Sequence, residues 1–342
     1  MKKSLIALLI FFWHANINAQ IKQEIKNLVF EGAGVRGIAY CGAIQELESR
    51  GLLQNIEKVG GTSAGAMMAL TISLGYTGEE TAKIIFNTNF KKFNDGGFFF
   101  AGGLNRTNKY FGWYRGYRLE KWLEKIIAAK TGDADITFEQ LHKNNFKDLY
   151  VTGTCINKQQ LIIFSHENYP EMKVKDAVRI SMSIPFYFEA VFIDEKGKVI
   201  HHPKQKKELD MLVDGGIIGN FPIRIFDSTK FISKNLVNSF IFNPRTLGFR
   251  IDSDDQIKND EEGKQLATMP VNNLKEYLLA FYNIVIENLN RQMLTPQDWK
   301  RTVSISDKKI GARSKIRLSA FEVKTLMQSG KESVKSRLAK NE

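Results

Sequence analysis

Short apolar runs alternate with longer amphipathic stretches in the first quarter of the chain. Strand-like runs occupy residues 28–31 and 56–59, and the stretches that follow them, 38–50 and 64–74, carry apolar residues at helical spacing. Alternation of this kind predicts an α/β fold in which a sheet is covered by helices on both faces.

The same pattern continues less regularly through the rest of the chain. Residues 149–156 and 160–165 are expected to form paired strands, and the charged stretch 252–264 is expected to be a loop. Late strands are expected over 240–242 and 248–251. Further helices are expected over residues 79–89, 119–129, 174–183, 273–293 and 319–339.

Residues 90–117 differ in texture, because aromatic residues are scattered there among glycines, lysines and arginines. We expect a loop region. It is either a cap over an acyl pocket or a surface that places aromatic rings among lipid headgroups. A local hydrophobic cluster under a long loop is the alternative. The aromatic residues are Phe90, Phe93, Phe98, Phe99, Phe100, Tyr110, Phe111, Trp113, Tyr114 and Tyr117.

A serine motif, Gly61-Thr62-Ser63-Ala64-Gly65, lies between the second strand-like run and its helix. This is the G-x-S-x-G spacing of acyl hydrolases, which present a serine at a sharp strand-to-helix turn. The glycines let neighbouring backbone approach, and the N-terminus of the following helix favours negative charge beside the serine. Ser63 is therefore a candidate nucleophile, and a glycine-rich turn with an incidental serine is the alternative.

A glycine-rich loop, Gly32-Ala33-Gly34-Val35-Arg36-Gly37, follows the first strand-like run. Its G-x-G-x-x-G spacing is also that of dinucleotide-binding loops, which need an acidic residue at the end of the second strand. The second strand here ends in the serine motif instead, which argues against a nucleotide. Backbone N–H groups of such a loop can equally form an oxyanion hole, where one donor is worth about 3–4 kcal/mol.

A third motif, Asp214-Gly215-Gly216, ends an apolar run at Leu212 and Val213. At the carboxyl end of a strand, Asp214 is expected to face the same sheet edge as the serine, where open α/β sheets bind ligands. An ordinary Asp-Gly turn is the alternative, and it is the better interpretation of this segment taken alone.

Together and in this order, the three motifs resemble the patatin-like phospholipases, whose pattern is G-G-G-x-R/K-G, then G-x-S-x-G, then D-G-G/A. The resemblance covers about residues 27–252 and includes the stretches 37–48, 177–185, 220–222 and 243–248. Ala33 departs from the pattern, since the family usually has glycine there. An alanine N–H can still donate if its backbone angles stay in a region open to non-glycine residues.

The resemblance implies a three-layer α/β/α sandwich around a mostly parallel sheet. It also implies a serine lipid acyl hydrolase of the phospholipase A type, active in lipid catabolism through an acyl-enzyme and without a cofactor. Ser63 would be the nucleophile and Asp214 the base of a dyad. Arg36 either orients the glycine-rich loop or meets a lipid phosphate, and we favour the first role. The other implied residues are the oxyanion donors Gly32, Ala33 and Gly34 and the motif positions Gly37, Gly61, Gly65, Gly215 and Gly216.

The histidines agree with a dyad, because none lies in a context that marks a triad base. An aspartate base must overcome a low intrinsic pKa of about 3.9, which a dry pocket can raise. No Cys, His or carboxylate cluster has the spacing of a catalytic zinc site, so we expect no metal requirement. The histidines are His14 in the leader, His142 and His166 in polar stretches, and His201 and His202 before a lysine-rich stretch.

The first 19 residues form a separate signal. Lys2 and Lys3 precede an apolar run over residues 5–13 that is too short to span a bilayer, and Ala19 offers a cleavage site before Gln20. This predicts a secretory signal peptide over 1–19, with an uncleaved anchor as the alternative. No cysteine follows the run, so a bacterial lipoprotein signal is absent. We expect an exported bacterial protein that is periplasmic, secreted or peripheral to the outer membrane.

The remaining residues, 20–342, are expected to form a single patatin-like domain with a helical C-terminal part, because the motifs are spread from Gly32 to Gly216. The net charge is +12, and removal of the two leader lysines lowers it to +10. Without nucleic-acid motifs, this charge favours contact with anionic membrane surfaces, and a generally lysine-rich composition is the alternative. Cys41 and Cys155 favour buried free thiols, although a disulfide stays open.

The sequence therefore predicts an exported serine hydrolase that acts on lipid esters, with membrane phospholipid as the expected substrate. The alternative from another class is a non-enzymatic protein that binds a phosphate or nucleotide in the G-x-G-x-x-G loop. The presence of both Ser63 and Asp214 argues against it. The lipid head group, acyl chain length, sn-position and oligomeric state stay open.

Overall fold

The computed structural model describes residues 24–96, 99–231, 238–310 and 317–339. The leader predicted over residues 1–19 lies outside these ranges. Within them, the structure has no helix whose length and apolar character would suffice to cross a bilayer.

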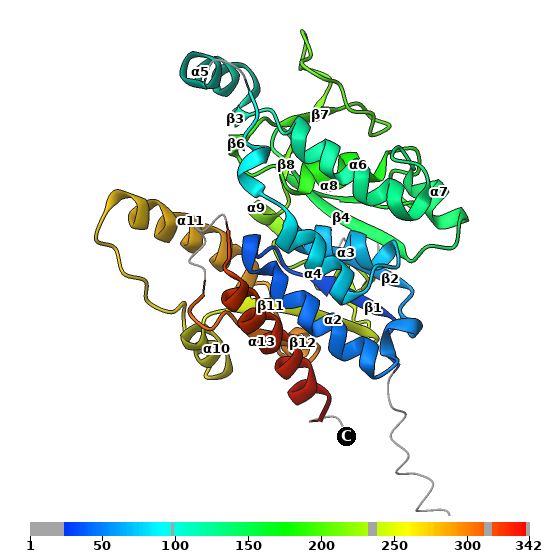
Figure 1. The fold of residues 1–342 in the computed structure, drawn as a ribbon, viewed down its shortest axis with the longest axis vertical. Coiled ribbons are helices and arrows are strands. Elements are labelled where there is room, and N and C mark those ends of the chain that lie inside the picture. Colours follow the sequence, from blue (N-terminus) through cyan, green and yellow to red (C-terminus); the bar gives the residue numbers. More distant parts are fainter. Residues whose placement is uncertain (1–23, 97–98, 232–237, 311–316, 340–342) are drawn as a thin grey trace, which may run out of the picture.

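The centre of the molecule is an eight-stranded sheet with the strand order β12-β11-β1-β2-β4-β8-β7, and β5 also pairs with β4 (Figure 1). The pairs from β12 to β4 are all parallel, whereas β5 and β8 run antiparallel to β4. The strands are β1 (Asn27–Phe30), β2 (Lys58–Gly61), β4 (Asp148–Cys155), β5 (Gln160–Phe164), β7 (Val191–Ile193), β8 (Asp210–Asp214), β11 (Thr246–Asp252) and β12 (Thr302–Ser306).

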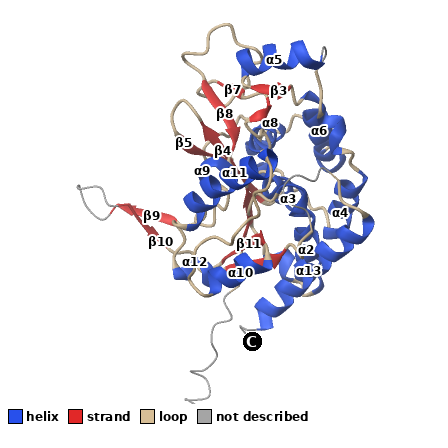
Figure 2. Cartoon of the chain, turned by 90° about the vertical axis from the view of Figure 1, so that its left-hand side faces the viewer, coloured by secondary structure: helices blue, strands red, loops and turns tan. Residues whose placement is uncertain are grey.

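Helices cover both faces of this sheet, so the predicted α/β architecture with a mostly parallel sheet is confirmed (Figure 2). One face carries α2 (Ala39–Ser49), α3 (Ala64–Ser73), α4 (Gly78–Asn87), α6 (Tyr117–Thr131), α8 (Val174–Ser181) and α13 (Ala320–Ala339). The other carries α9 (Gly216–Gly219), α11 (Leu274–Arg291) and α12 (Pro296–Lys300). Smaller elements at the periphery are α7 (Phe138–Lys143), α10 (Asp254–Glu261) and the hairpin of β9 (Ser228–Phe231) and β10 (Asn238–Ile241).

β1 shows how the sequence produces these layers. All four of its residues are buried, and successive side chains of a strand point to opposite faces. Leu28 and Phe30 belong to the main hydrophobic core, whereas Val29 packs with Phe221 and Ile223 in a second cluster. A strand buried on both sides reads as a continuous apolar run, which is the pattern that the sequence has there.

Residues 254–261 form α10, so the loop predicted over 252–264 is wrong in this part. The Ser253 side chain accepts a hydrogen bond from the Gln256 N–H, which caps the helix. Asp254 and Asp255 in the first turn complement the positive end of the helix dipole. The first charged residues of this stretch therefore form the capped first turn of a helix. Hydrophobic periodicity does not detect such a signal.

The aromatic stretch 90–117 is also more regular than the predicted loop. It contains α5 (Phe99–Tyr110) and β3 (Gly112–Tyr114), which pairs with β6 (Phe186–Phe188). The rings of Phe90 and Phe93 pack against Trp122, with centroids 6.2 and 5.4 Å away, as local core. Phe111 and Tyr117, by contrast, are exposed. Phe98 and the side chains of Phe99 and Phe100 lie outside the described part of the chain.

β2 and β8 lie end to end along one edge of β4. Val151 of β4 pairs with Gly61 of β2 on one side and with Phe164 of β5 on the other. β5 occupies one edge of β4 over residues 151–155. β8 pairs with residues 153–155, so it must lie on the opposite edge, which is the edge that β2 occupies up to Val151. Because β2 runs parallel and β8 antiparallel to β4, their carboxyl ends point toward each other.

This arrangement corrects the reason given for the position of Asp214. β8, which carries Asp214, runs antiparallel to β4 and therefore not parallel to β2. Its carboxyl end thus does not point to the same edge of the sheet as the carboxyl ends of the parallel strands. Instead, Asp214 pairs with Gly153, two residues beyond the partner of Gly61, and Ser63 follows Gly61 by two residues. The register of two opposed strands on β4 thus brings the two motifs to one level.

Candidate active site

Ser63 occupies a strained turn between β2 and α3. Its φ of 53° and ψ of −119° lie in a region that side-chain-bearing residues rarely adopt. A Cβ added at Gly65 would lie 2.2 Å from the Phe30 carbonyl oxygen, so this position accepts only glycine while β1 stays in place. The tightly packed turn holds Ser63 at the N-terminus of α3, where the helix dipole favours developing negative charge.

Asp214 is buried at the end of β8, and two neighbours stabilise its ionised carboxylate. The Gly216 N–H donates to Oδ1 at 2.8 Å, and the Ser63 side chain also favours the charged form. Burial raises the pKa of Asp214 to about 6, although both neighbours act to lower it. A carboxylate with a raised pKa beside a serine hydroxyl is placed to accept the proton of that hydroxyl.

The glycine-rich loop presents two free backbone donors rather than three. The Gly32 N–H donates to the Asn220 carbonyl oxygen at 3.0 Å, so the predicted oxyanion role of Gly32 is wrong. Within the described residues, the N–H groups of Ala33 and Gly34 donate to no acceptor. Ala33 has a φ of −135° and a ψ of 7°, which alanine can adopt, and the positive φ of 55° falls on Gly34. The departure at Ala33 therefore leaves the loop geometry intact.

Asn220 clamps this loop in place. Its Nδ2 donates to the Gly32 carbonyl oxygen at 3.1 Å, in addition to the bond that its own carbonyl accepts. A Cβ at Gly32 would lie 2.4 Å from Asn220 Oδ1. The Asn220 N–H in turn donates to Asn290 Oδ1 of α11 at 2.6 Å. Sequence analysis noted Asn220 only as part of a family stretch, since its partners are 188 and 70 residues away.

The C-terminal end of α8 and the residues that follow it hold both candidate catalytic residues. The Ser181 hydroxyl accepts a hydrogen bond from the Ser63 N–H at 2.9 Å, and the Ser183 carbonyl accepts one from the Asp214 N–H at 2.9 Å. Sequence reasoning assigned no role to these two serines. The only signal for them was the resemblance of residues 177–185 to a family segment.

The remaining motif glycines allow close packing around the dyad. A Cβ on any of them would meet a neighbour at 3.1 Å or less: Ala64 at Gly37, Gly65 at Gly61, Thr152 at Gly215, and Asn220 and Asp214 at Gly216. These glycines therefore hold the serine motif, the glycine-rich loop and the aspartate motif together.

The surroundings of Arg36 distinguish between the two roles that the sequence left open for it. It is buried, and its Nη1 lies 3.3 Å from Oδ2 of Asp307, just after β12. The contact ties the glycine-rich loop to the edge of the sheet, which favours the structural role over contact with a lipid phosphate.

A cluster of buried charged side chains lies next to the glycine-rich loop. Glu31, directly before Gly32, lies 2.9 Å from Nη2 of Arg250, whose side chain is fully buried. Arg250 also lies near Asp252 at 3.4 Å and near Glu287 of α11 at 3.2 Å. Burial and the neighbouring carboxylates raise the pKa of Glu31. These pairs join β1, β11 and α11 behind the glycine-rich loop.

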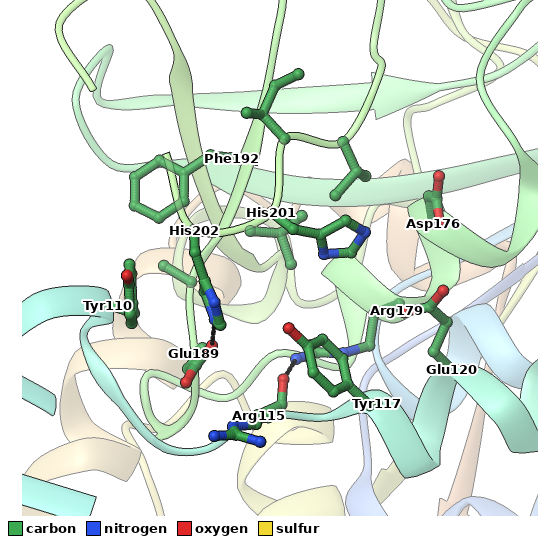
Figure 3. Close-up of a pocket in the computed structure, with 14 residues that line it drawn as sticks. Tyr110, Arg115, Tyr117, Glu120, Asp176, Arg179, Glu189, Phe192, His201 and His202 are labelled. Carbon is green, nitrogen blue, oxygen red and sulfur yellow. Dashed lines mark hydrogen bonds and ion pairs between the residues drawn. The ribbon is translucent and has the colours of Figure 1, made fainter. Parts of the chain in front are cut away.

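His201 and His202 line a separate pocket between α6, α8 and β7 (Figure 3). His202 Nε2 lies 3.0 Å from Glu189 Oε2, and its ring stacks on Tyr110 at 4.2 Å. The residues that line this pocket include neither Ser63 nor Asp214. Among the described residues, no histidine is hydrogen-bonded to either of them.

His142 and His166 meet at Asp148, where β4 begins. Their ring nitrogens lie 2.7 and 3.4 Å from the two oxygens of that carboxylate. This is the one group in the described ranges whose ligand types could hold a metal ion. However, the two rings are stacked at 4.0 Å and nearly parallel, at 5°, so one ion cannot lie in both ring planes. The hydrogen bond between His142 and Asp148 and the stacking of the two rings explain the arrangement.

Cys41 and Cys155 are both free and buried, which confirms the expectation of buried thiols. Burial raises the pKa of both thiols, so neither has the character of a reactive thiolate.

Comparison with known proteins places this geometry in context. The family model "Patatin-like phospholipase" matches residues 28–227. "Uncharacterized protein R571" of Acanthamoeba polyphaga mimivirus is 26% identical over 320 residues, which cover 93% of this chain and 95% of that protein. "Probable lipid hydrolase 463L" of Invertebrate iridescent virus 6 is 27% identical over 206 residues, which cover 58% of this chain and 62% of that protein. The crystal structure of VipD from Legionella pneumophila has a TM-score of 0.54 at 16% identity, covers 93% of this chain and 67% of its own, and shows the same fold.

Proposed function

The chain belongs to the patatin-like phospholipase family, and we propose that it is a serine lipid acyl hydrolase of the phospholipase A type with Ser63 as nucleophile and Asp214 as base. The single observation that carries the proposal is the placement of Ser63, in a strained turn at the N-terminus of α3, beside the buried Asp214 carboxyl, whose pKa the Ser63 side chain lowers. The family makes lipid the substrate class, and one relative is described as a probable lipid hydrolase.

In the first step, the Ser63 hydroxyl oxygen attacks the ester carbonyl carbon while Asp214 takes the hydroxyl proton. The carbonyl oxygen becomes an oxyanion, and the free N–H groups of Ala33 and Gly34 stabilise it together with the N-terminus of α3. The tetrahedral intermediate then expels the alcohol, to which Asp214 returns the proton. The acyl group remains on Ser63 as an ester.

In the second step, a water molecule attacks the acyl-enzyme while Asp214 accepts its proton. The same oxyanion donors act again, and the intermediate collapses to release the fatty acid. The proton moves from Asp214 to the Ser63 oxygen, which restores the resting enzyme. The raised pKa of Asp214 matches these exchanges better than an exposed aspartate would, because proton transfer is most efficient when base and operating pH are close.

We further propose that the substrate is a membrane phospholipid and that the protein makes peripheral contact with an anionic surface. The net charge supports this, since it is +12 and stays at +10 without Lys2 and Lys3 of the leader. Basic residues near an anionic bilayer contribute on the order of 1 kcal/mol each. Export through the leader over residues 1–19 is part of the same proposal, since it would give access to such surfaces.

Covalent labelling with a fluorophosphonate separates an enzyme from a protein that only binds phosphate or nucleotide in the glycine-rich loop. The purified mature protein should be labelled at Ser63, and Asp214→Asn should slow the labelling strongly. Ser63→Ala should abolish it. Absence of label on the folded wild-type protein, or attachment at another residue, would overturn the proposed nucleophile.

A further inference from the structure

α11 exposes an apolar stripe. Leu274, Tyr277, Phe281 and Ile284 are 73%, 57%, 61% and 53% exposed. Their spacing of three, four and three residues places them on one face of the helix. A surface helix normally turns such a stripe toward the core, with its polar face to water. These four apolar side chains of α11 face water instead, and contiguous exposed apolar patches mark interaction sites.

Polar contacts on the opposite face fix this orientation. Ile286, Glu287 and Asn290 are buried at the C-terminal end of α11. Glu287 pairs with the fully buried Arg250 at 3.2 Å, and Asn290 accepts the hydrogen bond from the Asn220 N–H at 2.6 Å. The stripe cannot turn inward without breaking these contacts, so its exposure is built into the fold.

The same helix adjoins the candidate active site. Through Asn220, α11 is connected to Gly32 in the glycine-rich loop, and it packs on α9, which begins two residues after Asp214. In Figure 1 the helix projects from the side of the molecule that also carries α5, and in Figure 2 it lies in front of α9. The helix that carries the stripe is therefore connected to the glycine-rich loop through its buried face.

We propose that the α11 stripe, defined as Leu274, Tyr277, Phe281 and Ile284, seats the protein on the lipid surface from which it takes its substrate. The inference rests on the proposed function, because a lipid acyl hydrolase needs a lipid surface beside its serine. The stripe residues carry no charge, and Phe, Leu and Tyr are the residue types that amphipathic helices place at the interface of a bilayer.

A second copy of the chain is the competing occupant, and the size of the stripe argues against it. Stable protein interfaces use about 20–30 residues a side, whereas among the side chains of α11 that the structure describes, four over about 15 Å of helix form this stripe. A bilayer sets no such requirement, since each apolar side chain that enters it gains separately.

The first test compares two matched double variants in vesicle co-sedimentation at about 1 M salt, where electrostatic attraction is screened to about 3 Å. Phe281→Ser/Ile284→Ser should lower the affinity for phosphatidylcholine vesicles at least tenfold. Ile156→Ser/Ile241→Ser, which removes two equally apolar exposed residues elsewhere, should bind like the wild type. Both variants should melt near the wild-type temperature and cleave a soluble short-chain ester within twofold of its rate.

A second test does not depend on loss of binding. Phe281→Cys, labelled with an environment-sensitive dye, should shift to shorter emission wavelength when vesicles are added, and Ile241→Cys should not. The two native thiols are buried and should stay unlabelled in the folded protein.

Three results would overturn the inference: unchanged vesicle binding by the stripe variant, equal dye responses at both positions, or a wild-type dimer that the stripe variant dissociates while vesicle binding persists. Failure of the wild-type protein to cleave any ester would instead contradict the proposed function, and the vesicle measurements would still decide the role of the stripe.

Discussion

Burial of one carboxyl group explains how an aspartate can serve as the base at this site. An exposed aspartate is ionised far below neutral pH and holds a proton poorly. At Asp214, loss of water raises the pKa to about 6, even though the Gly216 N–H and the Ser63 hydroxyl stabilise the charged form. These two neighbours thus orient the carboxylate, and burial supplies its basicity.

The pH dependence of hydrolysis should report this group. Asp214 must be deprotonated to accept the serine proton, so kcat/KM should rise with pH through an apparent pKa near 6 and level off above it. A steady-state profile from pH 4 to 9 on a soluble ester measures this. Because an imidazole titrates in the same range, the profile should be repeated with His201→Ala and His202→Ala. A limb that vanishes in either variant would contradict the assignment to Asp214.

Asn220 should act as a positioning residue for the oxyanion donors. Asn220→Ala removes the side-chain bond to the Gly32 carbonyl but keeps the backbone bond. We expect kcat to fall by about tenfold or more, short of the ~10²–10³-fold cost of losing a donor outright, with little change in KM. Steady-state kinetics give the split, and Asn243→Ala, in the loop between β10 and β11, serves as the control. A change in KM alone would place Asn220 in substrate binding instead.

The site residues that the sequence predicted are those whose spacing is local. Ser63 stands between two glycines in a turn, and Asp214 precedes two glycines, so each motif is complete within a few residues. Asn220, Ser181 and Ser183 could not be found in this way. Their contacts reach across the chain, and each becomes functional only when the sheet brings its partner near.

Among the elements, the meeting of β2 and β8 decides where the site forms. The two strands share one edge of β4 and point their carboxyl ends at each other, so their two turns converge without a parallel crossover. Periodicity predicted β2, β4 and β5 and most of the long helices. It could not give strand direction, because β8 is a buried run of the same character in either orientation. α10 was missed because its signal lies in a cap.

The buried charge cluster that joins β1, β11 and α11 should be a strong determinant of stability. Arg250→Met leaves the buried Glu31 without the cation that it pairs with and removes one of the two arginines beside Glu287, where Arg291 remains. We expect a loss of about 3–5 kcal/mol in the free energy of unfolding. Urea titration measures it. The exposed pair of Lys83 and Glu79 offers the control, since Lys83→Met should leave the free energy of unfolding nearly unchanged. Equal losses in the two variants would contradict a structural role for the cluster.

For the whole molecule, charge and apolar surface suggest two separable contributions to contact with lipid. The charge of +12 acts at a distance and is screened by salt, with a Debye length of about 8 Å at physiological ionic strength. The stripe on α11 acts only on contact and does not depend on salt. The aromatic stretch 90–117, which the sequence suggested for this role, contributes part of its rings to local core instead.

Vesicle binding should therefore show a salt-sensitive and a salt-resistant part. At low salt, the protein should prefer phosphatidylglycerol to phosphatidylcholine vesicles, and added salt should remove that preference. Co-sedimentation at several salt concentrations measures both parts, with the Phe281→Ser/Ile284→Ser variant keeping the preference and losing the remainder. Equal binding of the wild type to both lipids at low salt would refute the electrostatic part.

The central claim, a Ser63–Asp214 dyad that hydrolyses lipid esters without histidine, is tested most directly by turnover of phospholipid. The purified mature protein should release fatty acid from phospholipid vesicles. Ser63→Ala and Asp214→Asn should each lose several decades of rate, because nucleophile and base act as a unit. His201→Ala and His202→Ala should stay within a few-fold of the wild type. A folded histidine variant that lost as much as Ser63→Ala, or an Asp214→Asn variant with near wild-type turnover, would contradict the account.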